Sequence, residues 1–321
     1  MKILFFEVEP YEKEFFSKEL SSHDLVFYPD ALSSTNKDLI IDADIVTVFI
    51  GSRVTADVIS GAVKLKTVVT RSTGTDHIDV SALQQKNIFV LNVPHYGINT
   101  VAEHTFALIL ALSRNIIPSV ERTRHSNFSC EELTGFDLAG KTLGVIGLGN
   151  IGCRVAEIGN AFHMKVIGFN RSPKDLPSVT LVSLIDLLEQ SDIITIHTPL
   201  TSDTMHLINR ENMGHIKKGA YLINTARGGI IETEALVQLL QNKILAGVAL
   251  DVLEEEQTIK DERHLLSREY IELSSVKTLL LDHVLLEFPN VIITPHNAFN
   301  SKEALLEINT KTLENIQSVT K

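Results

Sequence analysis

The sequence has few cysteines and fewer basic than acidic residues, and both shortages exclude classes of protein. Only Cys130 and Cys153 occur in 321 residues, too few for a disulfide framework or a cysteine-based metal site. Lys and Arg number 29 against 40 Asp and Glu, so the formal net charge is −11. Because an acidic surface repels phosphate backbones and anionic lipid, we expect neither nucleic acid nor a membrane as the main partner.

Long apolar runs are absent as well. No run reaches the ~18 residues that a membrane span needs, and Glu7 and Glu9 interrupt the first apolar run too early for a signal peptide. Together with the low cysteine content, these features predict a soluble, cytoplasmic protein. The composition is 44% hydrophobic, and a length prior of roughly 150 residues per domain predicts about two domains.

Short apolar runs alternate with segments of helical period along the sequence. The runs predict buried strands at 3–6, 44–50, 67–70, 142–147, 165–169, 192–196, 221–224 and 291–294. Strands that are apolar on both faces and separated by helices are typical of parallel sheets covered on both sides. With right-handed crossovers, this pattern predicts a doubly wound α/β fold.

A domain boundary is predicted just before Thr100. Thr100 and Glu103 have the spacing of a capping box, which predicts that a long helix begins there and continues through the apolar run 106–112. We expect this helix to end within 114–118 and a loop to follow until a strand starts at Lys141.

A glycine-rich loop follows one of the predicted strands. Residues 147–152 read Gly-Leu-Gly-Asn-Ile-Gly and precede a segment of helical period. In such a loop the first glycine makes a tight turn, the second lets the backbone approach a pyrophosphate, and the third lets helix and strand pack closely. A diphosphate would then lie on amides at the positive end of the helix. The strand–turn–helix context therefore predicts a dinucleotide cofactor rather than a structural turn alone.

The carboxylate expected at the end of the next strand is missing. A dinucleotide site usually has an acidic residue about 20 residues after the loop, which binds the adenine ribose. Here Asn170 and Arg171 occupy that place. Arg171 could pair with a ribose 2′-phosphate, which favours NADP; alternatively, Asn170 binds the ribose hydroxyls and Arg171 points to solvent.

Three further features are predicted to meet at the carboxyl edge of the same sheet. Arg227 follows a strand in a turn of small residues, where its planar guanidinium could hold a carboxylate. Asp251 closes another strand and is followed by the acidic run 254–256, in which the sequence singles out no one glutamate. His296 closes the last strand. Between Asp251 and the strand at 291–294 lie about 40 residues, charged at first and then helical in pattern, and a connection of this length usually has a functional or interface role.

These segments resemble the D-isomer-specific 2-hydroxyacid dehydrogenase family, and within it the D-lactate dehydrogenases. The resemblance covers essentially the whole chain, with motif blocks in the family's order. The blocks are Gly147–Gly152, Ile196–Leu200 with Thr204, Asn224–Gly229, Asp251 with Glu256, and His296. The stretches 122–128, 133–136 and 296–305 resemble the D-lactate dehydrogenases in particular.

The resemblance implies the fold of each domain. A dinucleotide-binding Rossmann domain is expected at 100–298. A smaller, flavodoxin-like α/β substrate-binding domain is expected to combine 1–99 with 299–321. The helix after Thr100 and the loop 118–140 resemble the family's dimer arm, which implies a homodimer.

The resemblance also implies the residues of the site. The catalytic residues would be Arg227, Glu256 and His296. NAD or NADP would be bound by Gly147, Gly149, Asn150, Ile151, Gly152, Asn170, Arg171, Thr198, Pro199, Thr204, Thr225, Ala226 and Asp251. The substrate would be bound by Thr73, Gly74, Tyr96 and Arg227, and no metal would be needed. The loop 71–79 could equally be a turn and helix cap, and Tyr96 could be a packing residue.

The implied reaction is the reversible reduction of a 2-keto acid, pyruvate being favoured, to the D-2-hydroxy acid. His296 would give the proton to the carbonyl oxygen, and Glu256 would stabilise the imidazolium. A glyoxylate or hydroxypyruvate reductase is the alternative within enzymes: Arg171 favours it, whereas Tyr96 and the segment 122–136 argue against it. His95, beside Tyr96, departs from the D-lactate dehydrogenase pattern and leaves the size of the substrate open. A nucleotide-sensing regulatory protein on the same fold is the alternative outside enzymes.

Overall fold

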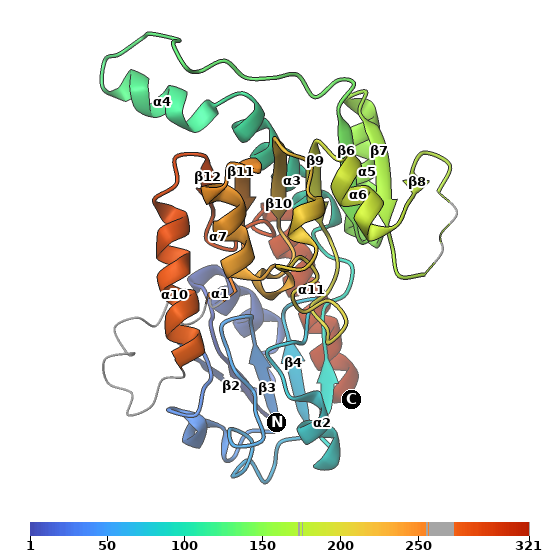
Figure 1. The fold of residues 1–321 in the computed structure, drawn as a ribbon. Helices are drawn as coiled ribbons and strands as arrows, with labels where there is room; N and C mark the ends of the chain where they lie inside the picture. Colours follow the sequence, from blue (N-terminus) through green and yellow to red (C-terminus); the bar gives the residue numbers. More distant parts are fainter. Residues whose placement is uncertain (173, 175, 255, 257–272, 321) are drawn as a thin grey trace. The chain divides into compact units, whose positions relative to one another are not determined.

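The computed structural model describes residues 1–172, 174, 176–254, 256 and 273–320. The chain divides into two compact units, one made of Met1–Gly97 with Asn300–Lys321 and the other of Ile98–Phe299 (Figure 1). Each unit has a parallel sheet, so the predicted doubly wound α/β fold is confirmed. Among the described residues, no helix is long and apolar enough to cross a membrane.

The first unit has a five-stranded sheet in the order β2-β1-β3-β4-β5, with every neighbouring pair parallel. The strands are β1 (Lys2–Phe5), β2 (Asp24–Phe27), β3 (Ile45–Val48), β4 (Thr67–Thr70) and β5 (Phe89–Leu91). The helical elements are α1 (Pro10–Glu19), η1 (Lys37–Ile40), α2 (Val80–Gln85) and α11 (Lys302–Thr320). Alternate side chains of β1 enter different cores. Ile3 and Phe5 pack with Phe16 of α1 and Ile316 of α11, whereas Leu4 packs in the core of the opposite face.

The second unit has a seven-stranded sheet in the order β12-β11-β10-β9-β6-β7-β8, also parallel throughout. The strands are β6 (Thr142–Ile146), β7 (Lys165–Phe169), β8 (Thr180–Leu181), β9 (Ile193–Ile196), β10 (Ala220–Asn224), β11 (Leu245–Leu250) and β12 (Val291–Ile293). The helical elements are α3 (Ile98–Ser113), α4 (Ile116–Arg124), α5 (Asn150–Ala161), α6 (Leu184–Gln190), η2 (Met213–His215), η3 (Gly228–Ile230), α7 (Thr233–Gln241) and α10 (Leu273–Leu286). The chain leaves β6 toward β7 and returns to β9 on its other side. A reversal of this kind is where open α/β sheets bind ligands.

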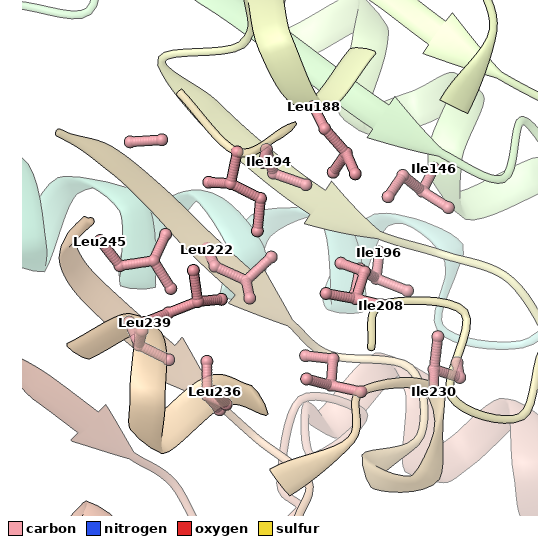
Figure 2. Packing of buried hydrophobic residues seen from close by; sticks show 14 of the residues in the cluster. Ile146, Leu188, Ile194, Ile196, Ile208, Leu222, Ile230, Leu236, Leu239 and Leu245 are labelled. Atoms are coloured by element: carbon pink, nitrogen blue, oxygen red, sulfur yellow. The ribbon is translucent and has the colours of Figure 1, made fainter. Parts of the chain in front are cut away.

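The two faces of this sheet bury different helices. Ile146, Ile194, Ile196 and Leu222 point to the face covered by α6 and α7 (Figure 2). Leu143 and Val145 point to the face covered by α3 and α5. Strands buried on both sides are the physical reason for the continuous apolar runs in the sequence.

Two local predictions were wrong at the start of this unit. The long helix α3 begins at Ile98, so Thr100 lies inside its first turn and does not cap it. Residues 116–124, expected to be a loop from Pro118 on, form α4 instead. Pro118 is the third residue of that helix. Proline is tolerated in a first turn, because amides there have no partner within the helix.

Edge strands were also missed by the sequence pattern. β2 and β5 lie at the two edges of the first sheet, and their residues are only partly buried. They were not predicted, although 25–28 and 88–91 are apolar runs as long as the one at 3–6. The charged stretch predicted after Glu256 falls on residues 257–272, which lie outside the described residues. The helical stretch predicted before β12 contains α10.

Candidate active site

The glycine loop joins β6 to α5 with geometry that suits a diphosphate. Gly147 has a φ of +91°, and a Cβ there would lie 2.6 Å from the carbonyl oxygen of His197. A Cβ on Gly152 would lie 1.9 Å from the carbonyl oxygen of Gly147. Gly149, the N-cap of α5, has no atom within 4 Å of the place its Cβ would take. Gly147 and Gly152 are therefore required by packing, whereas Gly149 leaves open space beside the helix amides of Asn150 and Ile151, as a dinucleotide requires.

Asn170 supports this loop directly. Its Oδ1 accepts from the amide of Leu148 at 3.1 Å, and its Nδ2 donates to the carbonyl of Ser172 at 2.8 Å. The Lys174 ammonium donates to the carbonyl of Leu148 at 2.6 Å, a contact that the sequence pattern did not predict. Arg171 lies in solvent, 82% exposed, with its Nη1 3.1 Å from Oδ2 of Asp203.

The segment after β9 forms a tight turn. The Thr204 hydroxyl donates to the carbonyl of Pro199 at 2.6 Å and accepts from the amide of Thr201 at 2.8 Å. His197 precedes the turn; the residue is half-buried, but desolvation of its ring lowers the pKa of His197 to about 3. The ring is therefore neutral at neutral pH and pairs with the Thr195 hydroxyl at 2.8 Å. Thr204 shapes the turn on which Thr198 and Pro199 lie.

The turn that holds Arg227 is fixed by a buried amide side chain. Asn224, fully buried at the end of β10, donates from Nδ2 to the carbonyl of Arg227 at 2.8 Å and accepts from the amide of Ala226 at 3.0 Å. Thr225 pairs its hydroxyl with that of Thr105 on α3 at 3.0 Å. The Arg227 side chain is half-buried, and its Nη1 donates to the carbonyl of Ala226 at 2.8 Å. The sequence placed Arg227 correctly after a strand, but the role of Asn224 in holding it was not foreseen.

Asp251 holds the turn that contains His296. The His296 backbone is left-handed, with a φ of +53°, a conformation that is uncommon outside glycine. The buried Asp251 carboxylate accepts from the Thr294 hydroxyl at 2.5 Å and from the amides of Asn297 and Ala298 at 3.0 and 2.8 Å. Burial acts to raise the pKa of Asp251, but these hydrogen bonds and one with His104 outweigh it, so the pKa is lowered and the group is ionised.

His296 and Glu256 form the pair that the sequence motifs suggested. The Nδ1 atom of His296 lies 2.8 Å from Oε2 and 3.1 Å from Oε1 of Glu256, and both side chains are about four-fifths buried, at 17% and 20% exposure. Within the acidic run, Glu254 instead contacts His206, and Glu255 lies outside the described residues. A histidine held through Nδ1 can exchange a proton with a substrate through Nε2.

The predicted substrate residues of the first unit lie on a loop that is held on both sides. The Thr73 hydroxyl donates to the carbonyl of Val93 at 2.9 Å, and Nδ2 of Asn92 donates to the carbonyl of Thr73 at 2.8 Å. The Ser72 hydroxyl donates to the carbonyl of Gly74 at 2.7 Å. Tyr96 is half-buried and lies three residues after Val93, the residue that accepts the hydrogen bond from Thr73. At the end of the same loop Asp79 caps α2, so the predicted capping role is also present.

His104 is a residue of the second unit that sequence reasoning missed. It lies on α3 among buried apolar residues, with Nε2 3.3 Å from the Thr294 hydroxyl and 3.6 Å from Oδ1 of Asp251. A polar residue on the buried side of an apolar helix was the available signal. Within the part of the chain that the structure describes, no group of three or more His, Cys, Asp or Glu side chains could hold a metal ion.

Comparison with known proteins gives consistent matches. The family described as D-isomer specific 2-hydroxyacid dehydrogenase, NAD binding domain, matches residues 106–298. The chain is 37% identical to 2-hydroxyacid dehydrogenase A of Aspergillus oryzae over 326 residues, which covers 99% of this chain and 92% of that protein.

Two solved structures are similar over nearly the whole chain. D-Lactate dehydrogenase from Aquifex aeolicus, complexed with NAD and lactic acid, has a TM-score of 0.90 and 34% identity, covering 99% of this chain and 95% of that chain. The pyruvate reductase of Chlamydomonas reinhardtii has a TM-score of 0.84 and 32% identity, covering 98% of this chain and 95% of that one.

Proposed function

Because the chain belongs to the D-isomer-specific 2-hydroxyacid dehydrogenase family, we propose that it reduces pyruvate reversibly to D-lactate with a nicotinamide cofactor. The family consists of NAD-dependent oxidoreductases that act on CH–OH groups. The observation that best supports the proposal is the 2.8 Å contact between Nδ1 of His296 and Oε2 of Glu256, at the end of β12. The names of the two solved relatives, which concern lactate and pyruvate, support this choice of substrate.

His296 is the proposed acid and base. The reduced nicotinamide supplies the hydride to the carbonyl carbon, and His296 donates the proton to the carbonyl oxygen from Nε2. In the reverse direction the same nitrogen accepts the proton from the hydroxyl group. Glu256 bonds Nδ1, which fixes the ring orientation and stabilises the positive charge of the imidazolium.

Arg227 is the proposed group that binds the substrate carboxylate and polarises the carbonyl. A guanidinium can hold a carboxylate through two parallel hydrogen bonds. A donor directed at the oxygen that gains charge commonly stabilises the transition state by about 3–4 kcal/mol. Thr73, Gly74 and Tyr96 are proposed as further substrate-binding residues by resemblance to the family, and two hydrogen bonds tie Thr73 to the segment that leads to Tyr96.

NAD fits the glycine loop, and we propose that NADP is used as well. Gly147, Gly149 and Gly152 with the amino end of α5 would hold the diphosphate, and Asn170, which bonds the loop amide of Leu148, would lie beside the ribose. No carboxylate at position 170 repels a 2′-phosphate, and Arg171 and Lys174 are two cations near it. Asp203 opposes this, since it pairs with Arg171. Steady-state kinetics with NADH and NADPH test the proposal, which a strong preference for NADH would overturn.

A homodimer is the proposed assembly. Within α4, Ile116, Ile117 and Val120 expose 48%, 40% and 42% of their surface, and Phe128 exposes 82% in the segment that follows. These residues lie in the stretch that resembles the family's dimer arm, and exposed apolar side chains grouped in this way are typical of interfaces. Light scattering tests the assembly, and a monomeric mass would reject it.

A glyoxylate or hydroxypyruvate reductase is the second candidate, favoured by the exposed cation Arg171, whereas Tyr96 and the stretch 122–136 argue against it. The discriminating experiment compares pyruvate, phenylpyruvate, glyoxylate and hydroxypyruvate, each with both cofactors. We expect the highest kcat/KM with pyruvate. A higher value with glyoxylate or hydroxypyruvate would support the second candidate. Tight nucleotide binding without turnover of any of the four would instead indicate a regulatory protein.

A further inference from the structure

Glu254 lies two residues before Glu256 but has different partners. Its Oε1 lies 2.5 Å from Nε2 of His206, and its Oε2 accepts from the hydroxyl of Thr233 at 2.6 Å and from the amide of Thr233 at 3.1 Å. The side chain is 18% exposed. One carboxylate therefore joins the segment after β11 to two other segments of the same unit.

The first of these segments is the stretch 206–208, which continues the turn after β9. His206 has a left-handed backbone with a φ of +50°, and its amide donates to the carbonyl of Gly229 at 2.9 Å. The amide of Ile208 donates to the carbonyl of Ile230 at 3.2 Å, and the amide of Glu232 donates to the carbonyl of Ile208 at 2.9 Å. The stretch thus runs parallel to 229–232, directly after Arg227.

The second segment is the beginning of α7. Thr233 is the first residue of the helix, and its N-cap residue Glu232 makes no side-chain hydrogen bond to the helix end. Amides in a first helical turn have no partner within the helix. The Glu254 carboxylate is the acceptor for the amide of Thr233, and this hydrogen bond holds the start of α7 against the segment after β11.

The Arg227 turn packs directly on the backbone at Glu254. A Cβ on Gly228 would lie 2.0 Å from the carbonyl carbon of Leu253 and 2.3 Å from the amide nitrogen of Glu254. No side chain fits between these two stretches of backbone. The backbone position of Glu254 therefore determines the position of the Arg227 turn, which packs against it. It also determines the position of Glu256, which follows two residues later.

We propose that Glu254 and His206 are positioning residues, which hold the Arg227 turn and the Glu256 segment in fixed register through the Glu254–His206 and Glu254–Thr233 hydrogen bonds. The inference rests on the proposed function, because it assigns Arg227 to the substrate carboxylate and Glu256 to His296. Neither Glu254 nor His206 touches the substrate or the cofactor in this account.

Substitution of Glu254 is the direct test. In Glu254→Ala the kcat/KM for pyruvate should fall about tenfold to a hundredfold, because small displacements of reacting groups are costly. The Kd for NADH should stay unchanged, since the glycine loop is not part of this network. Glu254→Gln should recover most of the loss, because its amide oxygen can still accept from Thr233 and its NH2 group can donate to the His206 ring.

A second variant removes only one arm of the network. His206→Asn suits the site because asparagine tolerates a left-handed backbone well. It should lower kcat/KM less than Glu254→Ala does, and it answers the question if Glu254→Ala fails to fold. The matched control is His215→Asn, which breaks an exposed histidine–glutamate pair with Glu189 at 2.8 Å in the same unit and should leave the kinetics unchanged.

Hydrogen–deuterium exchange separates this inference from the proposed function. Amides of the stretch 225–231 should exchange faster in Glu254→Ala and His206→Asn than in His215→Asn, whether or not pyruvate is the substrate. Wild-type kcat/KM values combined with a lowered melting temperature, or exchange equal to that of the control, would overturn the positioning role. Absence of keto-acid turnover in the wild type would overturn the proposed function, and the exchange measurement would still decide on Glu254.

Discussion

At the scale of single residues, several buried or partly buried carboxylates bond the backbone amides of loops as well as side chains. Asp251 accepts hydrogen bonds from two backbone amides of the turn that contains His296, and Glu254 accepts one from the first amide of α7. In the first unit, Glu7 accepts from the amides of Phe49, Gly51 and Ser52. A carboxylate that accepts several amides fixes a loop for which the sequence shows no regular pattern.

Arg71 gives the clearest prediction on stability. Its side chain, 1% exposed, forms an ion pair with Glu12 at 2.8 Å and donates to the carbonyls of Phe6 and Glu7 at 2.6 and 2.7 Å. Arg71→Met leaves Glu12 buried without its cation, so the free energy of unfolding should fall by about 3–5 kcal/mol. Denaturant titration measures the change.

The exposed ion pair of Lys37 with Asp57 in the same unit provides the control. Lys37→Met should change the free energy of unfolding by less than about 1 kcal/mol, because water screens the pair. Equal effects of Arg71→Met and Lys37→Met would contradict the account.

Glu256 gives a prediction on catalysis. Glu256→Gln removes the negative charge beside Nδ1 of His296 while preserving the shape of the side chain. The rate of pyruvate reduction should fall about tenfold or more at neutral pH, and the pH–rate profile should move to lower pH, because the imidazolium loses its anionic neighbour. Glu189→Gln is the control. An unmoved profile would show that Glu256 is not the partner in the reaction.

At the scale of elements, the glycines of the loop 147–152 have two different roles: Gly152 is required for packing, and Gly149 leaves room for the ligand. Gly152→Ala places a methyl group against the carbonyl of Gly147 and should lower the melting temperature. Gly149→Ala places it in open space, so the fold should keep its melting temperature while the methyl group meets the diphosphate and weakens NADH binding. Differential scanning fluorimetry and NADH fluorescence titration measure the two effects. Equal loss of stability in both variants would contradict this distinction.

His197, at the end of β9, should make the stability of the folded protein depend on pH. Desolvation lowers its pKa to about 3 in the folded protein, against about 6.5 in an unfolded chain. Between these values the unfolded chain binds a proton that the folded chain does not, so acidification should reduce stability by up to about 1.4 kcal/mol per pH unit.

Replacement of His197 tests this linkage. His197→Gln removes the titrating ring and should flatten the dependence of the melting temperature on pH between about 6.5 and 4. His215→Gln, which replaces an exposed histidine, should keep the wild-type slope. If His197→Gln also keeps that slope, the ring is not held neutral.

Strands buried on both faces were largely predictable from the sequence, and so was the edge strand β12, whereas the edge strands β2 and β5 were not predicted. β4, β6, β7 and β9 follow continuous apolar runs, because helices cover both sides of them. β2 and β5 lie at sheet edges and are only partly buried. α4 exposes most of its residues, so it lacks the apolar periodicity of a buried helix.

The same reasoning applies to the candidate site. The glycine loop, Arg227 and His296 stand at strand ends, where the sequence pattern locates them. His104 and His206 contact residues far apart in the chain, so the local sequence pattern does not give their partners.

At the scale of the whole molecule, an acidic protein would need local positive charge to bind the proposed anionic ligands, a keto acid and a dinucleotide. The net charge is −11, yet Arg171, Lys174 and Arg227 all lie at strand ends or loops of the second unit. The attraction between a cation and an anionic ligand a few ångströms away outweighs repulsion by distant acidic residues, because salt screens the distant charges. Each unit also has its own buried core on both faces of its sheet, as a protein of two domains requires.

The central claim is that the protein reduces a 2-keto acid to the D-hydroxy acid through His296. The direct measurement incubates pyruvate and NADH with the wild-type protein and with His296→Ala, follows NADH consumption, and determines the configuration of the product by chiral chromatography. The account predicts D-lactate in amounts equal to the NADH consumed by the wild type, and a rate lower by at least about a thousandfold in His296→Ala with NADH binding retained. L-Lactate as product, or near-normal turnover by His296→Ala, would contradict it.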